Sequence, residues 1–556
     1  MKRLLFVLII LLAFGAGKGF TQTVDSTTLN AASITGTVTL NSSTEYIIKG
    51  FNVIQSGGAL VIPAGTILKG DKATTGTIIV QRGGILYANG SQNSPIVFTS
   101  RFAPGQRGPG DWGGIVVLGR SSINTSTGAD SAKIEGFPSG TDFYYGGQPV
   151  VNDDSSGCLR YVRLEYPGVN LTGVSGNEIN GLTMGGVGSR TVLEYIQVTH
   201  SGDDAFEWFG GNVNPKYLIA LGSIDDDFDC DNGWRGKCQF GLAIRDTNFV
   251  DVSNSHFFEI DNNNNNPSNF NSPRTQPVFS NITCIGPNST NNPLFARGLH
   301  IRRNSLPSIF NSVMGGYGKL FYFDGSGVYN ACDGDTIRLR NLAMSYINKL
   351  SDTAGGSFNS QDWLLTPSFN NTVNNPISAF MLKNPFAFYG ATGSGTLSGV
   401  DWWEPMTGSP VLTGASFSDP YLNGFEVTSY RGAFDNVTDG AGNWTSGWSN
   451  FNPQNYEPVG VLQISSNVPE RFTLSQNYPN PFNPSTKINF SVPVKGFVSL
   501  KIYDALGQEV ATLLNQDLSV GEYAYEFDGT QLSSGIYFYT LRGDNFVETK
   551  KMMLVK

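Results

Sequence analysis

Short apolar runs separated by glycine-containing turns fill the chain from about residue 22 to residue 345. The runs are rich in Val and Ile, which favour strands. No stretch has the 3.6-residue apolar period of an amphipathic helix, so alternating βαβ units are not expected. The pattern predicts an all-β region built as a sandwich, a barrel or a β-solenoid. Typical runs are Gly58–Gly65, Gly76–Gly84, Ile85–Gly90, Pro95–Thr99 and Trp112–Gly119.

An internal repeat decides among these architectures. Ser201–Gly211 aligns without gaps on Ser223–Gly233, and Asp203 meets Asp225 at an offset of 22 residues that holds throughout. A single period in the low twenties matches one coil of a parallel β-helix, in which each coil buries its apolar side chains against the next. We therefore expect residues 22–345 to form a parallel β-helix with equivalent positions stacked in columns.

Two further regions follow the predicted β-helix. Residues 346–465 are rich in Asn, Ser, Gly and aromatic residues and show no repeat. We expect them to form an irregular β segment that caps the end of the solenoid, where a sheet edge would otherwise be open, and a linker that begins near Pro453 and Pro458. From residue 466 to residue 556, alternating positions such as Ser499–Tyr503 predict antiparallel strands.

The first residues predict an export signal. Met1–Arg3 is basic, Leu4–Phe14 is an unbroken apolar run, and small residues follow it, which is the order of a secretory signal peptide. The apolar run is shorter than the roughly 20 residues that a membrane span needs. We expect residues 1–21 to be the signal peptide, the mature chain to be exported, and no later segment to span a membrane.

Composition narrows the class of protein. Charged residues are 15 %, aromatic residues 12 %, and 67 of the 556 residues are glycine. A disordered chain has more charge and fewer aromatic residues, and a helical bundle is richer in Ala, Glu, Lys and Leu. The net charge of −9 comes with no basic run, which argues against nucleic acid or an anionic membrane surface as a partner.

Several motifs of the predicted β-helix resemble a known family. They are Asp111–Gly119, Leu159–Tyr166, Asn177–Thr183, Tyr430–Phe434 and the two Asp-Asp turns, and they are similar to a group of secreted bacterial proteins. The resemblance covers roughly residues 45–455. It implies a right-handed parallel β-helix similar to that of the pectin lyases. Most members of the group lack an assigned activity, so the resemblance supports the fold more than any chemistry.

The last region carries a more specific resemblance, to the C-terminal sorting domain of proteins exported by the type IX secretion system. It covers residues 466–556 and implies a small Ig-like β-sandwich that the type IX machinery recognises. The resemblance also implies a location outside the cell or on the outer-membrane surface. An ordinary appended Ig-like module is the alternative. The motifs are Phe472–Thr486, Ile488–Pro493, Val498–Val510, Leu532–Tyr539 and Lys550–Lys556.

The two aligned turns hold the strongest candidate for chemistry. In the 22-residue register their carboxylates lie on neighbouring coils about 4.8 Å apart, where they repel one another and raise one another's pKa. A calcium ion, which takes six to eight oxygen ligands, would relieve the repulsion. The alternative is that the carboxylates accept hydrogen bonds from turn backbone N–H groups. The residues are Asp203, Asp204, Glu207, Asp225, Asp226, Asp227, Asp229 and Asp231.

A catalytic use of this column requires a base as well as acids. Enzymes like the pectate lyases combine calcium ligands with an Arg or Lys that removes a proton beside a uronate, and Arg235, Lys237 and Arg245 follow the column closely. Carboxylate pairs such as Asp203 and Asp225 are alternatively the groups that glycoside hydrolysis requires. No lyase or hydrolase motif is matched residue by residue.

Aromatic side chains offer a third possibility, because exposed rings stack on sugars. Packing in the core or in turns is nevertheless the more common state of such residues. The candidates are Trp112, Trp208, Phe209, Trp234, Trp402 and Trp403.

The asparagine run Asn262–Asn266 and the histidines are given structural interpretations. We expect the asparagines to form a solvated surface loop rather than an internal stack. His200, which precedes the first Asp-Asp turn, is interpreted as a hydrogen-bonded turn residue rather than a general base. His200, His256 and His300 lie far from any CxxC spacing, and the chain contains none, so a zinc site is not expected.

The chain has five cysteines, and export permits disulfides. Cys230 and Cys238 bracket a Gly-containing loop and can close a small ring. Cys284 and Cys332 are a second candidate pair, although sequence cannot fix connectivity. One cysteine must then stay unpaired.

These observations favour a secreted or cell-surface protein of binding or structural type that acts on polysaccharide or extracellular matrix. The alternative is a polysaccharide lyase or glycoside hydrolase with an acidic, calcium-dependent site. An enzyme should present acids, a base and aromatic side chains on one face of the β-helix, whereas a structural protein need not.

Overall fold

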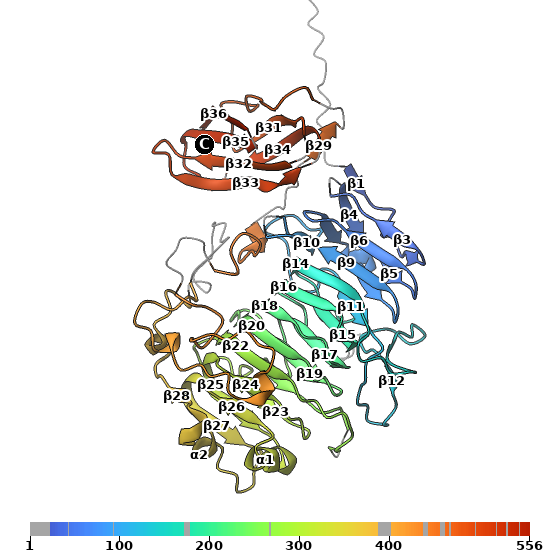
Figure 1. The fold of residues 1–556 in the computed structure, drawn as a ribbon, viewed down its shortest axis with the longest axis vertical. Coiled ribbons are helices and arrows are strands. Elements are labelled where there is room, and N and C mark those ends of the chain that lie inside the picture. Colours follow the sequence, from blue (N-terminus) through green and yellow to red (C-terminus); the bar gives the residue numbers. More distant parts are fainter. Residues whose placement is uncertain are drawn as a thin grey trace, which may run out of the picture.

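Three parallel ladders of strands wind around one core and form the β-helix that the repeat predicts (Figure 1). The structure is a computed structural model that describes residues 23–556 except 43, 93, 172–177, 266–267, 387–401, 437–442, 456–461, 466–468, 495, 519, 530–531 and 544. The predicted signal peptide, residues 1–21, lies outside the described residues. Among these residues, no helix is both long enough and apolar enough to cross a membrane.

The ladders are named A, B and C for the three sides of each coil. Ladder A contains β1 (Thr23–Asp25), β4 (Thr44–Ile48), β7 (Ile67–Gly70), β10 (Ile96–Ser100), β14 (Gly157–Glu165), β16 (Val192–Thr199), β18 (Lys216–Leu221), β20 (Lys237–Ile244), β22 (Val278–Ile285), β25 (Val313–Phe323), β27 (Ala343–Thr353) and β28 (Thr372–Val373).

Ladder B begins with β2 (Ser33–Ile34), β5 (Phe51–Ile54), β8 (Thr77–Val80), β11 (Gly114–Leu118) and β15 (Leu182–Val187). It continues through β17 (Phe206–Gly211), β19 (Phe228–Asp231), β21 (Phe258–Ile260), β23 (Leu299–Ile301) and the last residues of β25 and β27. Ladder C contains β3 (Thr37–Thr39), β6 (Ala59–Ile62), β9 (Ile85–Asn89), the first residues of β14, β16, β18, β20 and β22, and then β24 (Ser308–Phe310) and β26 (Arg338–Arg340).

Register within ladder B confirms the predicted coil. Phe206 pairs with Phe228, and Glu207 pairs with Asp229, which are the residues matched by the 22-residue repeat. The next two coils are longer, because Phe228 pairs with Phe258 and Phe258 pairs with Leu299. All four apolar residues of this column are fully buried. The extra residues of the longer coils form loops outside the ladder. The apolar residues therefore stay stacked although the number of residues per coil changes.

The corner between ladders C and A is built from residues with positive φ. Four of them, Tyr161, Tyr195, Tyr217 and Phe240, are bulky residues for which this conformation is unusual. Their rings stack at centroid distances of 4.3, 4.3 and 5.1 Å, and the stacking contacts help to offset the backbone cost. On the following coils the corner residues are Asn281, Asn311, Asn341 and Asn370, a type that tolerates this conformation well.

The β-helix extends beyond its predicted end at residue 345. That position lies inside β27, and parallel pairing continues to β28. The second half of β27 carries Lys, Ser, Asp and Thr, so its sequence lacks the apolar run that marks earlier strands. Helices α1 (Ser326–Asp333) and α2 (Ser360–Leu364) lie at this end of the solenoid (Figure 1), and Trp363 packs its ring edge-on against Phe323. This part of the chain provides the expected cap.

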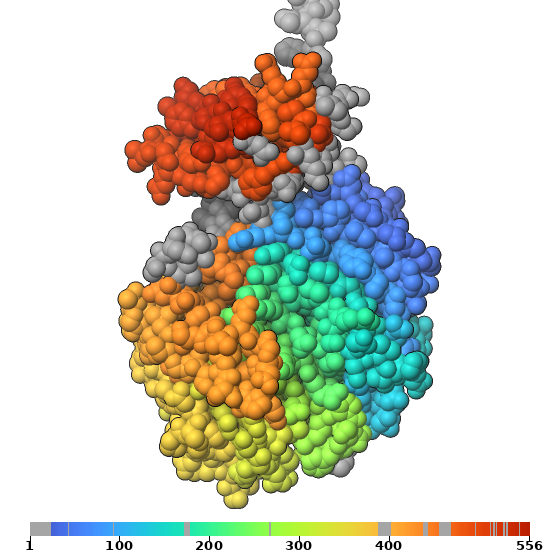
Figure 2. Space-filling model, viewed as in Figure 1, coloured from blue at the N-terminus to red at the C-terminus, as the bar shows by residue number. Residues whose placement is uncertain are grey.

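Residues 374–455, here called the return segment, do not cap the end but run back along the side of the β-helix. Arg431 donates to the carbonyl of Leu342 near the last coil, whereas Arg107, in the loop between β10 and β11, donates to the carbonyl of Pro453. In Figure 2 the orange part of the segment lies over the green coils. It covers outward apolar side chains of ladder A, such as Ile219 and Leu242, which explains why it ends far from the cap position predicted from sequence.

The C-terminal region is a β-sandwich, as predicted. One sheet contains β29 (Leu462–Ser465), β34 (Gly521–Asp528), β31 (Ser485–Val492) and β30 (Thr473–Leu474). The other contains β33 (Glu509–Leu518), β32 (Gly496–Tyr503), β35 (Gly535–Gly543) and β36 (Phe546–Leu554). Residues of both sheets, such as Phe490 and Tyr539, share one apolar core. Strand β29 places the start of the sandwich slightly before residue 466.

The aromatic corner generates a testable prediction. Trp448 of the return segment is fully buried and packs edge-on against Tyr161 and Tyr195. We expect Trp448→Ala to destabilise the chain by about 3–5 kcal/mol and to expose the return segment to protease. Thermal unfolding and limited proteolysis measure these effects. Trp402→Ala, at a half-buried ring in the same segment, is the control with a smaller loss, and an equal loss in both variants would contradict the interpretation.

Candidate functional site

The outward positions of ladder B form a row of polar side chains. Alternation along each strand turns Phe206, Phe228 and Phe258 inward, so the next residue on each strand faces outward. These residues are Glu207, Asp229 and Glu259, and they pair in register on three successive coils. We call these three residues the acidic row. His300 follows Glu259 on the next coil.

Five further carboxylates, those of Asp203, Asp204, Asp225, Asp226 and Asp227, lie in the turns that enter β17 and β19. Asp204 Oδ1 accepts a hydrogen bond from the backbone N–H of Asp226 at 2.8 Å, and Asp226 Oδ1 accepts one from the backbone N–H of His256 at 2.6 Å. Each turn is thereby tied to the next coil. For these two residues the backbone hydrogen-bond alternative is confirmed, whereas the side chains of Asp203 and Asp225 are half-buried beside them.

The turn acids and the acidic row converge in two groups. The carboxylate oxygens of Asp203, Asp204 and Asp225 lie within 4.8 Å of one another, and so do those of Asp204, Glu207 and Asp229. Burial, and after it the charges of neighbouring carboxylates, raises the pKa of all five groups well above the usual range. The predicted crowding of carboxylates on neighbouring coils is therefore present.

Arginine side chains balance the charge at the far end of the row. Glu259 Oε2 lies 2.5 Å from Arg302, and Asp261 lies 2.6 Å from both Arg302 and Arg303. Burial would raise the pKa of Glu259, but Arg302 and the neighbouring imidazoles hold it below its usual range. At Asp231, burial and the charge of Asp261 raise the pKa to about 7.

Asp227 is not part of the acidic row, which corrects its assignment as a metal ligand. Its side chain is fully buried and lies 3.1 Å from the Arg245 guanidinium, which is also fully buried. Arg245 donates as well to the carbonyls of Ser223 and His256. It therefore holds the acidic turn in place from inside the core. Because it is fully buried and paired with Asp227, Arg245 is not available as the base that the sequence suggested.

The other candidate bases are not bonded to the acidic row. Arg235 is exposed and donates to Ser122 at 3.1 Å. Burial lowers the pKa of Lys237, but this strand position belongs to ladder C, and the amine donates to the carbonyl of Asn423 at 2.6 Å. His200 lies 3.3 Å from Asp246, in agreement with its interpretation as a hydrogen-bonded turn residue.

The aromatic candidates are mostly core residues. Trp208 and Trp234 stack at 4.3 Å inside the β-helix, and Trp112 and Trp403 are also fully buried. Phe209 is buried against an insertion between β11 and β14, which contains the hairpin of β12 (Ser131–Lys133) and β13 (Tyr144–Gly146). Sugar stacking by these rings is therefore excluded, and of the six candidates only Trp402 is half-buried.

Two sequence expectations about loops and cysteines are corrected. Asn262 and Asn263 are buried and bond the side chain of Asn124, so they lock the insertion to the coil instead of forming a solvated loop; Asn266 lies outside the described residues. All five cysteines are free. Cys230 and Cys238 point into the core from different ladders and pack there as small apolar side chains.

The second predicted pair of cysteines also lies on two different elements of the structure. Cys284 lies on β22 and Cys332 on α1, and both are buried. The predicted disulfides are therefore not formed.

Sequence reasoning missed the second half of the site. Phe258–Asp261 repeats the order of Phe, acid, apolar residue and acid that Phe228–Asp231 shows, and this motif was the available signal. Its spacing is 30 residues instead of 22, because a loop is inserted between the two strands. Glu135 and Glu178, from outside the repeat, add negative charge beside Asp203.

The fold and the site together describe an all-β parallel solenoid that carries a row of acidic side chains on ladder B. A family model described as a pectate-lyase-like β-helix domain matches residues 32–381. The chain therefore belongs to the pectate-lyase-like β-helix family. A second model, described as a secretion system C-terminal sorting domain, matches residues 476–556. The sorting domain is thereby confirmed, and the protein is secreted or displayed at the cell surface.

Comparisons with individual proteins add little to this. No curated protein matches the chain. Two solved structures are similar at 11 % identity: tailspike protein 2 of Escherichia coli O157:H7 bacteriophage CAB120, with a TM-score of 0.23, and the Dettilon tailspike protein, with a TM-score of 0.16. Each match covers 92 % of this chain; the chain spans 64 % of the first structure and 88 % of the second.

The raised pKa values generate a prediction for pH. A carboxyl group whose folded-state pKa is raised stays protonated in the folded chain, whereas the unfolded chain ionises it above about pH 4. Stability must then fall as the pH rises from that value through the raised pKa. In a chelator, we expect the melting temperature to drop by several degrees between pH 5 and pH 8. An Asp203→Asn/Asp225→Asn variant should show a smaller drop, while Asp142→Asn, at an exposed ion pair, should behave as the unchanged chain.

The buried ion pair generates a second prediction. Arg245→Met leaves the Asp227 carboxyl buried without its cation, and we expect a loss of about 3–5 kcal/mol in the free energy of unfolding. Arg245→Met/Asp227→Leu removes both charges and should recover part of the loss. Denaturant unfolding of the two variants measures the difference. A double variant less stable than Arg245→Met would show that the pair is not the cause.

Proposed function

We propose that the protein is a secreted or surface-displayed polysaccharide-binding protein whose binding face is the acidic row of ladder B. One observation carries the proposal. Glu207, Asp229 and Glu259 repeat in register on successive coils and lie on a different ladder from the one that the return segment covers. The Asp229 and Glu259 side chains are half-buried, and Glu207 is buried beneath the surface of the face. A regular row of hydrogen-bond acceptors suits a repeating polymer better than a single small molecule. The sorting domain supports a place of action where such polymers occur.

The proposal includes calcium as an ion that the turn acids hold. The donor set is suitable, because Ca²⁺ prefers carboxylate oxygens. Asp229 Oδ1 is shielded from solvent and has no hydrogen-bond partner among the described residues. Asp203, Asp204, Glu207 and Asp225 would share the ion with it. Bound calcium would neutralise their charge and provide a ligand position for the carboxylate of an acidic sugar.

A second candidate function is cleavage of the same polymer by a lyase or hydrolase. It is favoured by the raised pKa of the Glu207 and Asp229 carboxyl groups, since a protonated carboxyl at neutral pH is what a general acid requires. Fold alone does not decide between binding and cleavage. The two functions differ in their products, so one experiment separates them.

Calcium binding is tested first. We expect Ca²⁺ to raise the melting temperature of the chelator-treated chain, and to raise it more at pH 8 than at pH 5, because protons compete for the carboxylates at low pH. Asp203→Asn/Asp225→Asn should lose most of this rise. Isothermal titration that finds no binding, together with an unchanged melting temperature, would exclude calcium.

Polysaccharide binding is tested with the full chain on a panel of acidic and neutral polysaccharides by affinity gel electrophoresis. We expect acidic polymers to retard the chain in Ca²⁺. Glu207→Gln/Asp229→Asn should weaken the binding by at least about tenfold, equivalent to 1.4 kcal/mol. Glu426→Gln, at an exposed side chain of the return segment, is the matched control. Equal binding by both variants would contradict the proposed face.

Cleavage is followed in the same samples as new reducing ends and unsaturated-uronide absorbance. Products that vanish in a still-folded Asp203→Ala/Asp225→Ala variant would make the protein an enzyme with its site at the turn acids. Binding without products leaves the binding function. Neither binding nor products with any polymer would reject the proposed function.

A further inference from the structure

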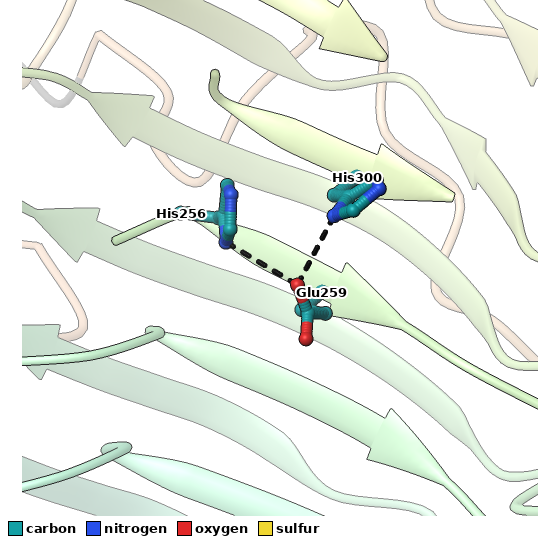
Figure 3. A group of neighbouring side chains, drawn as sticks. All are labelled: His256, Glu259 and His300. Carbon is teal, nitrogen blue, oxygen red and sulfur yellow. Dashed lines mark hydrogen bonds and ion pairs between the residues drawn. The ribbon is translucent and has the colours of Figure 1, made fainter. Parts of the chain in front are cut away.

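Two histidines that are 44 residues apart in the sequence meet beside the acidic row. His256 lies just before β21, Glu259 lies on β21, and His300 lies on β23, where it pairs directly with Glu259. The three side chains converge on one place, as Figure 3 shows. Their possible ligand atoms all lie within 4.8 Å of one another. The two histidines are almost completely buried, at 2 % and 4 % exposure.

Both imidazole rings direct Nδ1 towards the same carboxylate oxygen. Glu259 Oε1 lies 3.1 Å from His300 Nδ1 and 3.7 Å from His256 Nδ1. Asp226 Oδ1 lies 2.9 Å from His256 Nδ1. Three successive coils thereby contribute the three ligand atoms of His256, Glu259 and His300 and the Asp226 oxygen that contacts His256.

We propose that His256, Glu259 and His300, with Asp226 beside them, bind a divalent transition-metal ion of the Zn²⁺ type. Imidazole nitrogen together with carboxylate oxygen is a donor set for such ions, whereas Ca²⁺ takes oxygen ligands. Tetrahedral ligands at about 2.0–2.1 Å from a metal lie about 3.3 Å from one another. Glu259 Oε1 lies 3.1 Å from His300 Nδ1 and 3.7 Å from His256 Nδ1, on either side of that value.

The surroundings of the cluster resemble the outer sphere of a metal site. His300 Nε2 lies 3.5 Å from Asp324 Oδ2, and such a carboxylate fixes the ring orientation of a metal-bound histidine. Arg302 pairs with Glu259 Oε2, which leaves Oε1 as the oxygen that faces the histidines. Asp229 forms a further carboxylate group with Asp226 and Glu259, within 4.8 Å, so a cation there would also relieve repulsion between acids.

Metal binding must rearrange the protons of this cluster. Arg297 Nε donates to His256 Nε2 at 3.1 Å, so the proton of the neutral His256 ring lies on Nδ1, which is 2.9 Å from Asp226 Oδ1. A metal at Nδ1 requires the neutral ring to carry its proton on Nε2 instead, and Arg297 must then give up its hydrogen bond to Nε2. The ring of Tyr322, 4.6 Å from the Arg297 guanidinium, provides that cation with another partner.

The site shares Glu259 with the proposed polysaccharide-binding face, but metal binding does not require that function. It revises the expectation of no zinc site. That expectation rested on sequence spacing, but a coil of 41 residues brings His300 next to Glu259. A bound ion would crosslink two coils of ladder B and the turn before β19.

The test uses the full chain, treated with a chelator and titrated with Co²⁺ as a spectroscopic probe for zinc. We expect one equivalent of Co²⁺ to bind with the visible absorption of histidine-coordinated cobalt, and Zn²⁺, but not excess Ca²⁺, to remove the absorption. The His256→Gln/His300→Gln variant should lose the signal. His200→Gln, which removes the third histidine, outside this cluster and beside Asp246, is the matched control and should keep the signal.

A second variant and a second measurement guard against misfolding. Glu259→Gln keeps the shape of the side chain but removes its charge, and it should lose stoichiometric binding. Zn²⁺ should raise the melting temperature of the unchanged chain and of His200→Gln, but not that of Glu259→Gln. Equal cobalt absorption in the unchanged chain and in His256→Gln/His300→Gln, or binding unaffected by Glu259→Gln, would overturn the proposal.

Discussion

The stacking of equivalent positions on successive coils is the constraint on which the rest of the structure depends. Strand alternation assigns each position to the core or to the surface, and parallel register then repeats that assignment coil after coil. On ladder B the inward positions are Phe206, Phe228 and Phe258, which make the core continuous. The same register fixes the outward neighbours of these residues. The acidic side chains are therefore stacked on the outer surface of ladder B, because each one directly follows a phenylalanine of the stacked core column.

Much of the fold could be predicted from the sequence, because one coil keeps the 22-residue repeat and the signal of alternating apolar runs is local. The convergence of Asp203 with Asp225 followed from the same reasoning, whereas the sandwich was implied by the resemblance of the last region to sorting domains. The next two coils could not be aligned with this repeat, since insertions lengthen the steps from Phe228 to Phe258 and on to Leu299. A search for a fixed spacing therefore could not place Glu259, His256 and His300 beside one another.

Other expectations failed because contacts between distant segments decide them. Nothing local in Asp227 or Arg245 distinguishes a buried pair from exposed groups; the fold does so by turning both side chains into the core. Cys230 and Cys238 are close in sequence, but a corner of the coil separates their strands. The return segment carries no repeat, and its position depends on apolar side chains of ladder A that it alone covers.

The return segment also changes how the solenoid can come apart. In an ordinary repeat protein each coil contacts only its neighbours, so unfolding can begin at one end and proceed coil by coil. Here one stretch of chain bonds the last coils through Arg431 and the early coils through Arg107. The last coil cannot unfold locally without first losing its contacts to the return segment, which is also bonded many coils away. We therefore expect the β-helix to unfold as one cooperative unit, because contacts between distant coils prevent unfolding that proceeds from one coil to the next.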